Sequence, residues 1–205
     1  FYVILVYMPT FANRQLNLPL TDAFTAQVIA VALMTLLMPV FGALSDRVGR
    51  KLLIIAATAG LLIVLYPLFS WVHAAPSFAR LMTMQVVLCT LLAVFFGPFS
   101  AAVAEQFPAG VRSTGLALAY NLAVMIFGGF AQFIVTWLIH TTGLPIAPVF
   151  YVMFAAVLGL VAGIFLIDRT HELRLEVVDD GGSVSPAVQP PSANTPPRRA
   201  ATQGL

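Results

Sequence analysis

Residues 42–51, which read GALSDRVGRK, gather one acid and three bases in a short segment between two long apolar runs. Asp46 directly precedes Arg47, and Arg50 follows Asp46 by four residues. Carboxylates and guanidinium groups form strong, often bidentate, hydrogen bonds when they lie close together. The two glycines of the segment favour a tight turn. We therefore expect a charged network at this turn, at the surface of a membrane.

A second charged segment, residues 105–112, begins with Glu105 and ends with Arg112. The proline and the glycine between these two residues stop the preceding helix, so both charges can lie beside the first segment. We expect a single network in which the acids Asp46 and Glu105 face the bases Arg47, Arg50 and Arg112. A static brace that also marks the membrane topology is the alternative interpretation of the same charges.

The composition excludes a soluble domain. Of the 205 residues, 60% are hydrophobic and 9% are charged, against about 45–50% and about 25% in soluble domains. Lipid must therefore cover much of the surface. The net charge of +2 does not indicate a nucleic-acid partner, because the bases stand at the ends of apolar runs, as membrane topology requires. We expect the lipid bilayer as a partner and no nucleic acid.

No pattern of nucleophiles or metal ligands is visible in the sequence. Cys89 is the single cysteine and lies inside an apolar run, which leaves no disulfide framework and no thiolate metal site. The histidines lie at the ends of apolar runs or near the C-terminus, without a sign of convergence. Ser70 and Ser100 lie within apolar runs with no internal histidine or acid beside them. We expect no catalytic residue, no metal and no cofactor, and therefore no enzyme.

Hydrophobic runs of membrane length predict an all-α, polytopic helix bundle. Residues 1–11 form an apolar stump, about half of the roughly 20 residues that a spanning helix needs. Because the chain begins inside this apolar run, we expect its first helix to be cut short. Short polar turns separate the later runs, so the helices must pass up and down through the bilayer. The five full spans that we expect cover residues 23–44, 52–73, 81–105, 114–139 and 148–167.

The distribution of basic residues predicts the orientation of these spans. One set of connections carries most of the bases, namely Arg47, Arg50, Lys51 and Arg112, and the opposite set carries only Arg14 and Arg80. By the positive-inside rule, the first set is cytoplasmic. The C-terminus then lies in the cytoplasm as well. Residues 171–205 are rich in Pro, Gly, Ser and Ala, and we expect them to form a disordered cytoplasmic tail after a membrane domain over residues 1–170.

Neutral polar side chains within the spans are candidates for a substrate path. No Asp, Glu, Lys or Arg lies in the middle of any span, so these spans lack the buried ionisable residue that usually marks an ion pathway. If the protein moves protons, we expect the proton-binding carboxylate to lie outside this chain. Asn121 and Gln132 share one stripe of a helix with Met125 and Gly128. The residues that we expect to line the path are Tyr7, Gln27, Gln85, Asn121 and Gln132. Hydrogen bonds between neighbouring helices are the alternative role of these amides.

The segment GALSDRVGRK resembles the G-x-L-S-D-R-x-G-R-K/R loop of the major facilitator superfamily of secondary transporters. In that superfamily the loop occurs once in each six-helix half, between the second and third helices. The Glu105–Arg112 segment resembles the E-x6-R element that follows the fourth helix of a half. The order of these motifs, with Gly97-Pro98, Phe127-Gly-Gly-Phe and Pro148-Val-Phe-Tyr-Val-Met, is similar to the second half of the metabolite:H⁺ symporter family. Its members include citrate, α-ketoglutarate, shikimate and proline/betaine permeases.

The resemblance implies the C-terminal six-helix half of a twelve-helix transporter, with a partial helix seven followed by helices eight to twelve. It also implies that the charged network closes the cytoplasmic end and breaks when the cavity opens inward. We expect proton-coupled uptake of a small metabolite, an organic acid, across a bacterial inner membrane by alternating access. Its partners would be the substrate, the proton and a missing N-terminal six-helix half. A proline/betaine-type osmolyte symporter and a non-transporting membrane fragment remain the alternatives.

Overall fold

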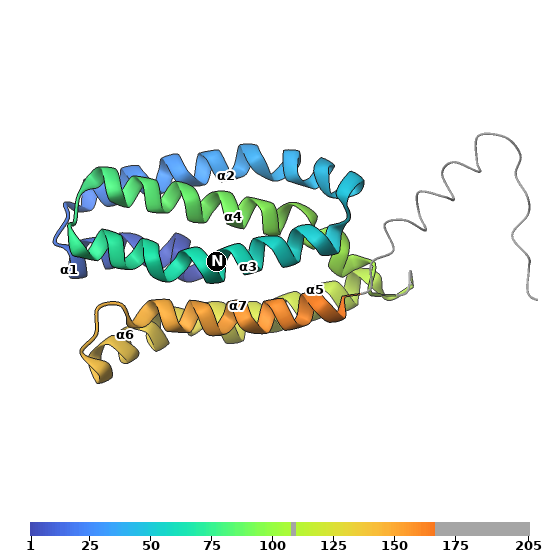
Figure 1. Cartoon of the computed structure of the whole chain (residues 1–205). Helices are drawn as coiled ribbons and strands as arrows, with labels where there is room; N and C mark the ends of the chain where they lie inside the picture. Colours follow the sequence, from blue (N-terminus) through green and yellow to red (C-terminus); the bar gives the residue numbers. More distant parts are fainter. Residues whose placement is uncertain (108–109, 167–205) are drawn as a thin grey trace, which may run out of the picture. The chain divides into compact units, whose positions relative to one another are not determined.

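The computed structural model describes residues 1–107 and 110–166, and within these ranges the chain is helical with no strand. The sequence therefore predicted the all-α class correctly. The expected cytoplasmic tail, residues 171–205, lies outside the described residues. Figure 1 shows the helices running back and forth along one common direction. The elements are η1 (Val3–Tyr7), α1 (Met8–Leu16), α2 (Leu20–Val48), α3 (Arg50–Ala74), α4 (Phe78–Ala104), α5 (Arg112–Ala123), η2 (Val124–Gly129), α6 (Ala131–Thr142) and α7 (Ala147–Phe165).

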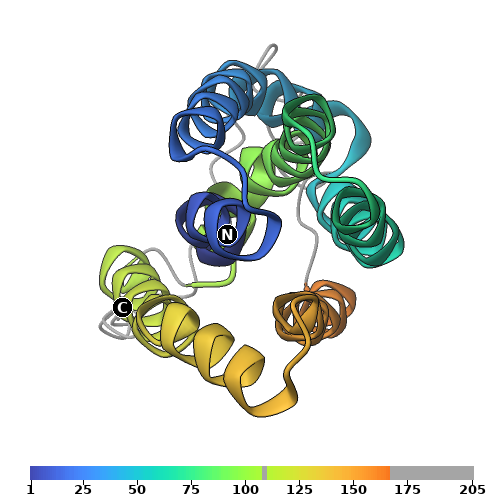
Figure 2. The same cartoon turned by 90° about the vertical axis from the view of Figure 1, so that its left-hand side faces the viewer.

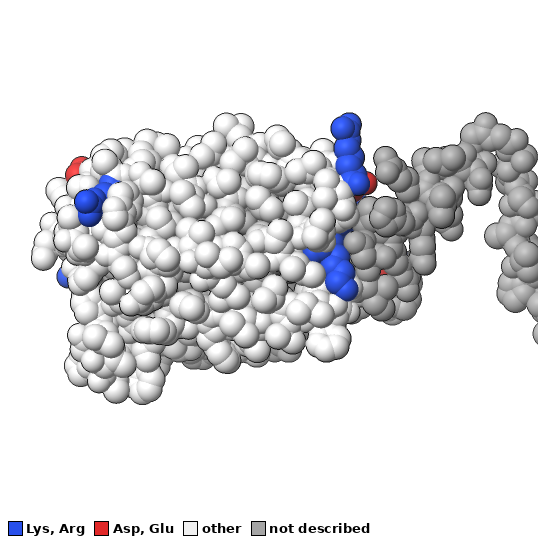
Figure 3. Space-filling view, in the orientation of Figure 1, with Lys and Arg blue, Asp and Glu red and all other residues white. Residues whose placement is uncertain are grey.

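Five segments of the described chain are long and apolar enough to cross a membrane, namely α2, α3, α4, the combined α5–η2–α6 segment and α7. Many of their large apolar side chains face outward, such as Leu36 at 71% exposure, Ile63 at 72% and Phe133 at 70%. Soluble monomers rarely expose contiguous apolar surface on this scale. Figure 3 shows lysine and arginine side chains at the two ends of the view, separated by a wide uncharged surface. This surface suits the hydrocarbon core of a bilayer.

Gly49 is the whole connection between α2 and α3. Its φ of 107° and ψ of 132° lie in a region that L side chains rarely adopt and glycine adopts readily. We expected a turn over residues 42–51, and this prediction was wrong in its extent, because α2 continues to Val48 and α3 begins at Arg50. Alanine, leucine and arginine are good helix formers, so the residues before Gly49 stay helical. The expected spans 23–44 and 52–73 were several residues too short for this reason.

The segment over residues 112–142 is not one regular helix. A π-helical stretch, η2, follows α5, and the chain turns at Phe130 before α6 begins. A π turn adds about one residue to the α-helical turn, which changes the direction of every later side chain. The stripe that we expected through Asn121, Met125, Gly128 and Gln132 assumed uniform α-helical spacing, and the π turn between its two ends makes that assumption wrong.

The core of the bundle forms where α1, α2, α3 and α4 meet. Helices α2 and α4 form the most extensive pair, followed by α3 with α4 and α3 with α7. Figure 2 shows the N-terminal helix in the centre of the end-on view. Phe11 of α1 is buried against Phe69 of α3, with ring centroids 5.3 Å apart. The stump that we expected over residues 1–11 thus extends to Leu16, where Asn17 in the left-handed conformation ends the helix.

Local signals explain where the charged ends of the helices lie. Ser77 accepts a hydrogen bond from the backbone N–H of Arg80 at 3.3 Å and so caps the start of α4. Helix α4 then runs to Ala104, which places Glu105 at its end. Because α2 and α4 run in the same direction, as Figure 1 shows, the end of α4 lies at the same end of the bundle as the α2–α3 junction. This arrangement brings the two charged segments together.

Candidate functional site

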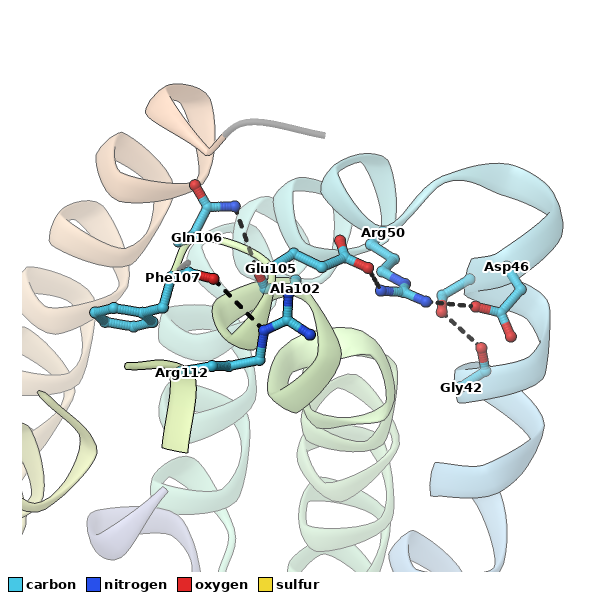
Figure 4. Close-up of polar contacts among 9 residues, drawn as sticks. Gly42, Asp46, Arg50, Ala102, Glu105, Gln106, Phe107 and Arg112 are labelled. Carbon is cyan, nitrogen blue, oxygen red and sulfur yellow. Dashed lines mark hydrogen bonds and ion pairs between the residues drawn. The ribbon is translucent and has the colours of Figure 1, made fainter. Parts of the chain in front are cut away.

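Arg50 joins the two charged segments. Its Nη2 atom lies 3.1 Å from Oδ1 of Asp46, one turn earlier in the chain, and its Nη1 atom donates to Oε1 of Glu105. Figure 4 shows the guanidinium group between the two carboxylates. The positive φ of Gly49 turns the chain so that Arg50 starts α3 beside the end of α2. One side chain therefore links the ends of α2 and α4 to the start of α3.

The two ion pairs of Arg50 differ in their contact with solvent. The side chains of Arg50 and Glu105 are only 17% and 14% exposed, whereas that of Asp46 is 63% exposed. An exposed pair four residues apart on the chain contributes about 0.3–0.5 kcal/mol. Removing the partner of a partly buried charge costs about 1–3 kcal/mol of stability. The Arg50–Glu105 pair is therefore the stronger link of the network.

Two of the expected bases lie beside this network and outside its ion pairs. Arg112 directs its Nε atom toward the carbonyl oxygen of Phe107, at 3.5 Å, and Figure 4 shows it close to the end of α4. Arg47 is exposed on the last turn of α2. Among the described residues, neither forms an ion pair with a carboxylate. The structure thus brings together Asp46, Arg50 and Glu105 of the five residues expected in the network.

Lys51 adds a contact that the sequence reasoning missed. Its Nζ atom donates a hydrogen bond of 2.6 Å to the carbonyl oxygen of Ile164, in the last turn of α7. The last carbonyl groups of a helix lack partners within the helix and attract cations. No local signal in the sequence marks this contact, because its acceptor is a backbone carbonyl 113 residues away. Through Lys51, the start of α3 is also bound to α7.

The amides of Gln27 and Gln85 meet between α2 and α4. Nε2 of Gln85 donates a hydrogen bond to Oε1 of Gln27, and both side chains are buried at 0% and 8% exposure. The sequence placed both residues on a substrate path, with an interhelical hydrogen bond as the alternative. The structure shows that hydrogen bond. Oε1 of Gln85 is buried and has no hydrogen-bond partner among the described residues.

The other three residues of the expected path lie on different elements, η1, α5 and α6. Tyr7 is buried near Thr136 of α6. Asn121 is exposed and donates to the carbonyl oxygen of Ala117 at 2.7 Å. Gln132 is exposed as well. Among the described residues, none of the three forms a hydrogen bond with Gln27 or Gln85.

A cavity of about 360 Å³ lies among η1, α4, α5, η2 and α7. Aromatic rings form much of its wall, and none of the five expected path residues lines it. The hydroxyl group of Tyr151, one of its lining residues, donates to the carbonyl oxygen of Phe127 at 3.0 Å. Among the described residues, no charged side chain borders the cavity. Its aromatic lining residues are Phe1, Tyr2, Phe95, Phe96, Phe99, Tyr120, Phe127 and Tyr151.

Comparisons with known proteins agree with this architecture. The family model described as Major Facilitator Superfamily matches residues 1–198. A citrate-proton symporter of Klebsiella pneumoniae is 37% identical over 83% of this chain and 38% of its own length. A citrate-proton symporter of Salmonella typhi is 35% identical over 82% of this chain and 39% of its own length.

A more distant relative carries a different name. The ectoine/proline transporter ProP of Corynebacterium glutamicum is 31% identical over 83% of this chain and 34% of its own length. The chain therefore spans well under half of the length of these curated relatives. No solved structure matches the chain.

Proposed function

Because the chain belongs to the major facilitator superfamily and is part of a multi-pass membrane protein, we propose that it is the C-terminal six-helix half of a proton-coupled symporter. In this proposal, helices seven to twelve correspond to η1–α1, α2, α3, α4, α5–η2–α6 and α7. The transporter carries a small metabolite into a bacterial cell by alternating access, and it is not an enzyme. The other half of the cavity belongs to an N-terminal six-helix half that precedes this chain.

The observation that carries the proposal is the position of Arg50 between Asp46 and Glu105. The two acids end α2 and α4, and Arg50 begins α3, so a single guanidinium group holds three helix ends together. Such a contact can exist in one arrangement of the helices and be absent in another, which is what a switching protein requires. We assign this network, the charged gate, to the closing of one end of the transport path.

The orientation of the gate follows from its charge. The end of the bundle with the gate carries most of the bases that we counted in the connections, and the opposite end carries Arg14 and Arg80. Bases are enriched in cytoplasmic connections. In our proposal the gate therefore faces the cytoplasmic side of the bacterial inner membrane. The C-terminus, which follows α7 in the sequence, is on the same side.

An organic acid is the substrate that the relatives support best, because two citrate-proton symporters are 37% and 35% identical to the chain, against 31% for the ectoine/proline transporter. The described spans contain no basic residue at mid-depth that could neutralise a carboxylate. The cations that bind the acid, and the carboxylate that binds the proton, are then supplied by the N-terminal half. In this arrangement the present half supplies the gate and part of the cavity wall.

A zwitterionic osmolyte such as proline or betaine is the second candidate. One relative is an ectoine/proline transporter, and the uncharged aromatic cavity also favours such a substrate. Rings such as those of Tyr2, Tyr120 and Tyr151 attract quaternary ammonium groups through cation–π interactions. A zwitterion also needs no net countercharge in the site. The third possibility is a membrane fragment that transports nothing.

The test is uptake by the complete transporter in proteoliposomes with an imposed pH gradient. We expect accumulation of labelled citrate and none of labelled proline or betaine. Glu105→Gln should reduce the initial rate about tenfold, since a loss of about 1.4 kcal/mol in the free energy that favours the closed gate corresponds to a factor of ten. The matched control is Asp22→Asn, which removes a carboxylate that forms no ion pair in the described chain. Accumulation of the osmolyte alone would select the second candidate, and accumulation of neither would contradict the proposal.

A further inference from the structure

Gly97 of α4 lies directly against the backbone of α2. A Cβ atom added to Gly97 would stand 2.8 Å from the backbone nitrogen of Gly42 and 3.0 Å from the carbonyl oxygen of Met38. These are the two atoms that an α-helix joins by its hydrogen bond between residues four apart. A methyl group at this position would therefore press on the α2 backbone. No rotamer change relieves such a contact, so α2 and α4 would have to move apart.

This contact lies just inside the charged gate. Gly42 precedes Asp46 by four residues, about 6 Å along α2, and Gly97 precedes Glu105 by eight residues, about 12 Å along α4. Arg50 follows the end of α2 after the single residue Gly49. The distance between the two helices at the glycine contact thus determines whether Arg50 can reach Glu105. Close packing of two helix backbones through small residues is common in membranes.

We propose that Gly97 is a positioning residue for the charged gate, because its missing side chain lets α4 approach α2 closely enough for the Arg50–Glu105 ion pair to form. Neither the family match nor the charged motifs assigns this role to Gly97. The consequence for transport rests on the proposed function. The consequence for the ion pair rests only on the packing of α2 against α4.

The two glycines of the contact differ in the space that they leave for a side chain, so Gly42 can serve as the matched control for Gly97. A Cβ atom added to Gly42 would meet the carbonyl oxygen of Gly97 at 3.5 Å, which is an ordinary van der Waals contact. Alanine should therefore be tolerated at Gly42 and not at Gly97. Both substitutions add one methyl group to a helical glycine, so a difference between them reports the contact and not helix propensity.

Ser45 provides a reporter for the opening of the gate. Its side chain is 1% exposed, on the last turns of α2, so a cysteine in its place should react slowly while α2 and α4 stay together. The experiment uses the complete transporter with Ser45→Cys and Cys89→Ser and without other cysteines, in inside-out membrane vesicles. The measured quantity is the rate of labelling by a membrane-impermeant maleimide. This rate does not require transport.

We expect Gly97→Ala to raise the labelling rate about 5- to 150-fold, the range that corresponds to the usual strain of one added methyl group. Gly42→Ala should stay within about twofold of the parent. In the double variant Gly97→Ala/Glu105→Gln, labelling should be no faster than in the faster of the two single variants, since both changes remove the same ion pair. A positioning role predicts this lack of additivity, whereas a general loss of packing predicts that the two effects add.

Several results would overturn the inference. They are an unchanged labelling rate in Gly97→Ala, equal effects at Gly42 and Gly97, or additive effects in the double variant. Failure of Gly97→Ala to accumulate in the membrane, where Gly42→Ala accumulates, would assign the contact to folding and overturn the positioning role too. If the parent protein transported neither citrate nor an osmolyte, the proposed function would fail while the labelling result would stand by itself.

Discussion

The ammonium group of Lys51, in the first turn of α3, donates a hydrogen bond to the carbonyl oxygen of Ile164, in the last turn of α7. Lys51 is adjacent to Arg50, so neighbouring side chains bind the start of α3 to α2, α4 and α7. We expect Lys51→Met to loosen the last turn of α7, because the carbonyl groups there lose a cationic partner worth about 0.5–1 kcal/mol. Hydrogen exchange measured by mass spectrometry should be faster for peptides that cover residues 160–166.

Lys51→Arg is the matched control for this prediction, because it keeps a cationic donor at the same position. Exchange in these peptides should then stay close to that of the parent protein. Unchanged exchange in Lys51→Met would show that α7 holds its end without Lys51. Faster exchange in both variants would assign the effect to the shape of the lysine side chain and not to its charge.

The two acids of the charged gate should differ in their effect on transport. Asp46→Asn removes an exposed pair within one helix turn and should reduce the uptake rate by about twofold. Glu105→Gln leaves Arg50 short of a partner at 17% exposure and should reduce the rate about tenfold. Initial rates of uptake, corrected for the amount of protein in the membrane, measure both. Equal losses, or a larger loss for Asp46→Asn, would contradict the order derived from exposure.

The sequence predicted the helical class, the five spans and the family, and the family model and the relatives confirm the family. It placed Asp46 and Glu105 in one network and did not rank them, because exposure depends on how α2 packs against α4 and cannot be read from spacing. The junction at Gly49 was misread as a longer turn because polar and charged residues also occur at the ends of continuous helices. The Lys51–Ile164 contact joins residues 113 positions apart, and no local pattern specifies such a pair.

The Gln27–Gln85 pair allows a test of its role as a substrate ligand or as an interhelical link. If the amides only link α2 to α4, each single change to leucine leaves one buried amide without a partner. The free energy of unfolding then falls by about 1–3 kcal/mol, and the melting temperature falls with it. The double variant Gln27→Leu/Gln85→Leu should recover most of that loss. We expect this recovery, with a KM for substrate close to that of the parent protein.

The measurement for the glutamine pair combines thermal unfolding in detergent with uptake kinetics. Gln27→Leu and Gln85→Leu are controls for each other, because each removes one member of the same hydrogen bond. A double variant that regains its stability but shows a KM raised about tenfold would place the amides on the substrate path, as the sequence suggested. A double variant less stable than either single variant would contradict the link.

The orientation of the bundle predicts which helix ends face each side of the membrane. Val48 at the end of α2 and Ala75 after α3 are both exposed and lie at opposite ends of the bundle. In intact cells, Val48→Cys should resist a membrane-impermeant maleimide until the cells are broken, and Ala75→Cys should react at once. Ser45, on the same end of α2, is buried at 1% exposure and suits the gate experiment instead. Labelling of position 48 from outside would reverse the proposed orientation.

Proton coupling should survive the loss of the acid at the opposite end of α2 from the gate. Asp22 lies in the first turn of α2, where a negative charge is favoured by the helix dipole. A coupling acid must exchange protons with both sides of the membrane and therefore belongs near mid-depth. The described spans have no carboxylate there, and Asp168, the acid that follows the last expected span, lies outside the described residues. We expect Asp22→Asn to retain accumulation of substrate driven by a pH gradient, with a rate within about twofold of the parent protein.

The measurement compares gradient-driven accumulation with exchange of substrate at equal pH on both sides. If Asp22→Asn abolished accumulation and kept exchange, the coupling acid would lie in this half, and its assignment to the N-terminal half would be wrong.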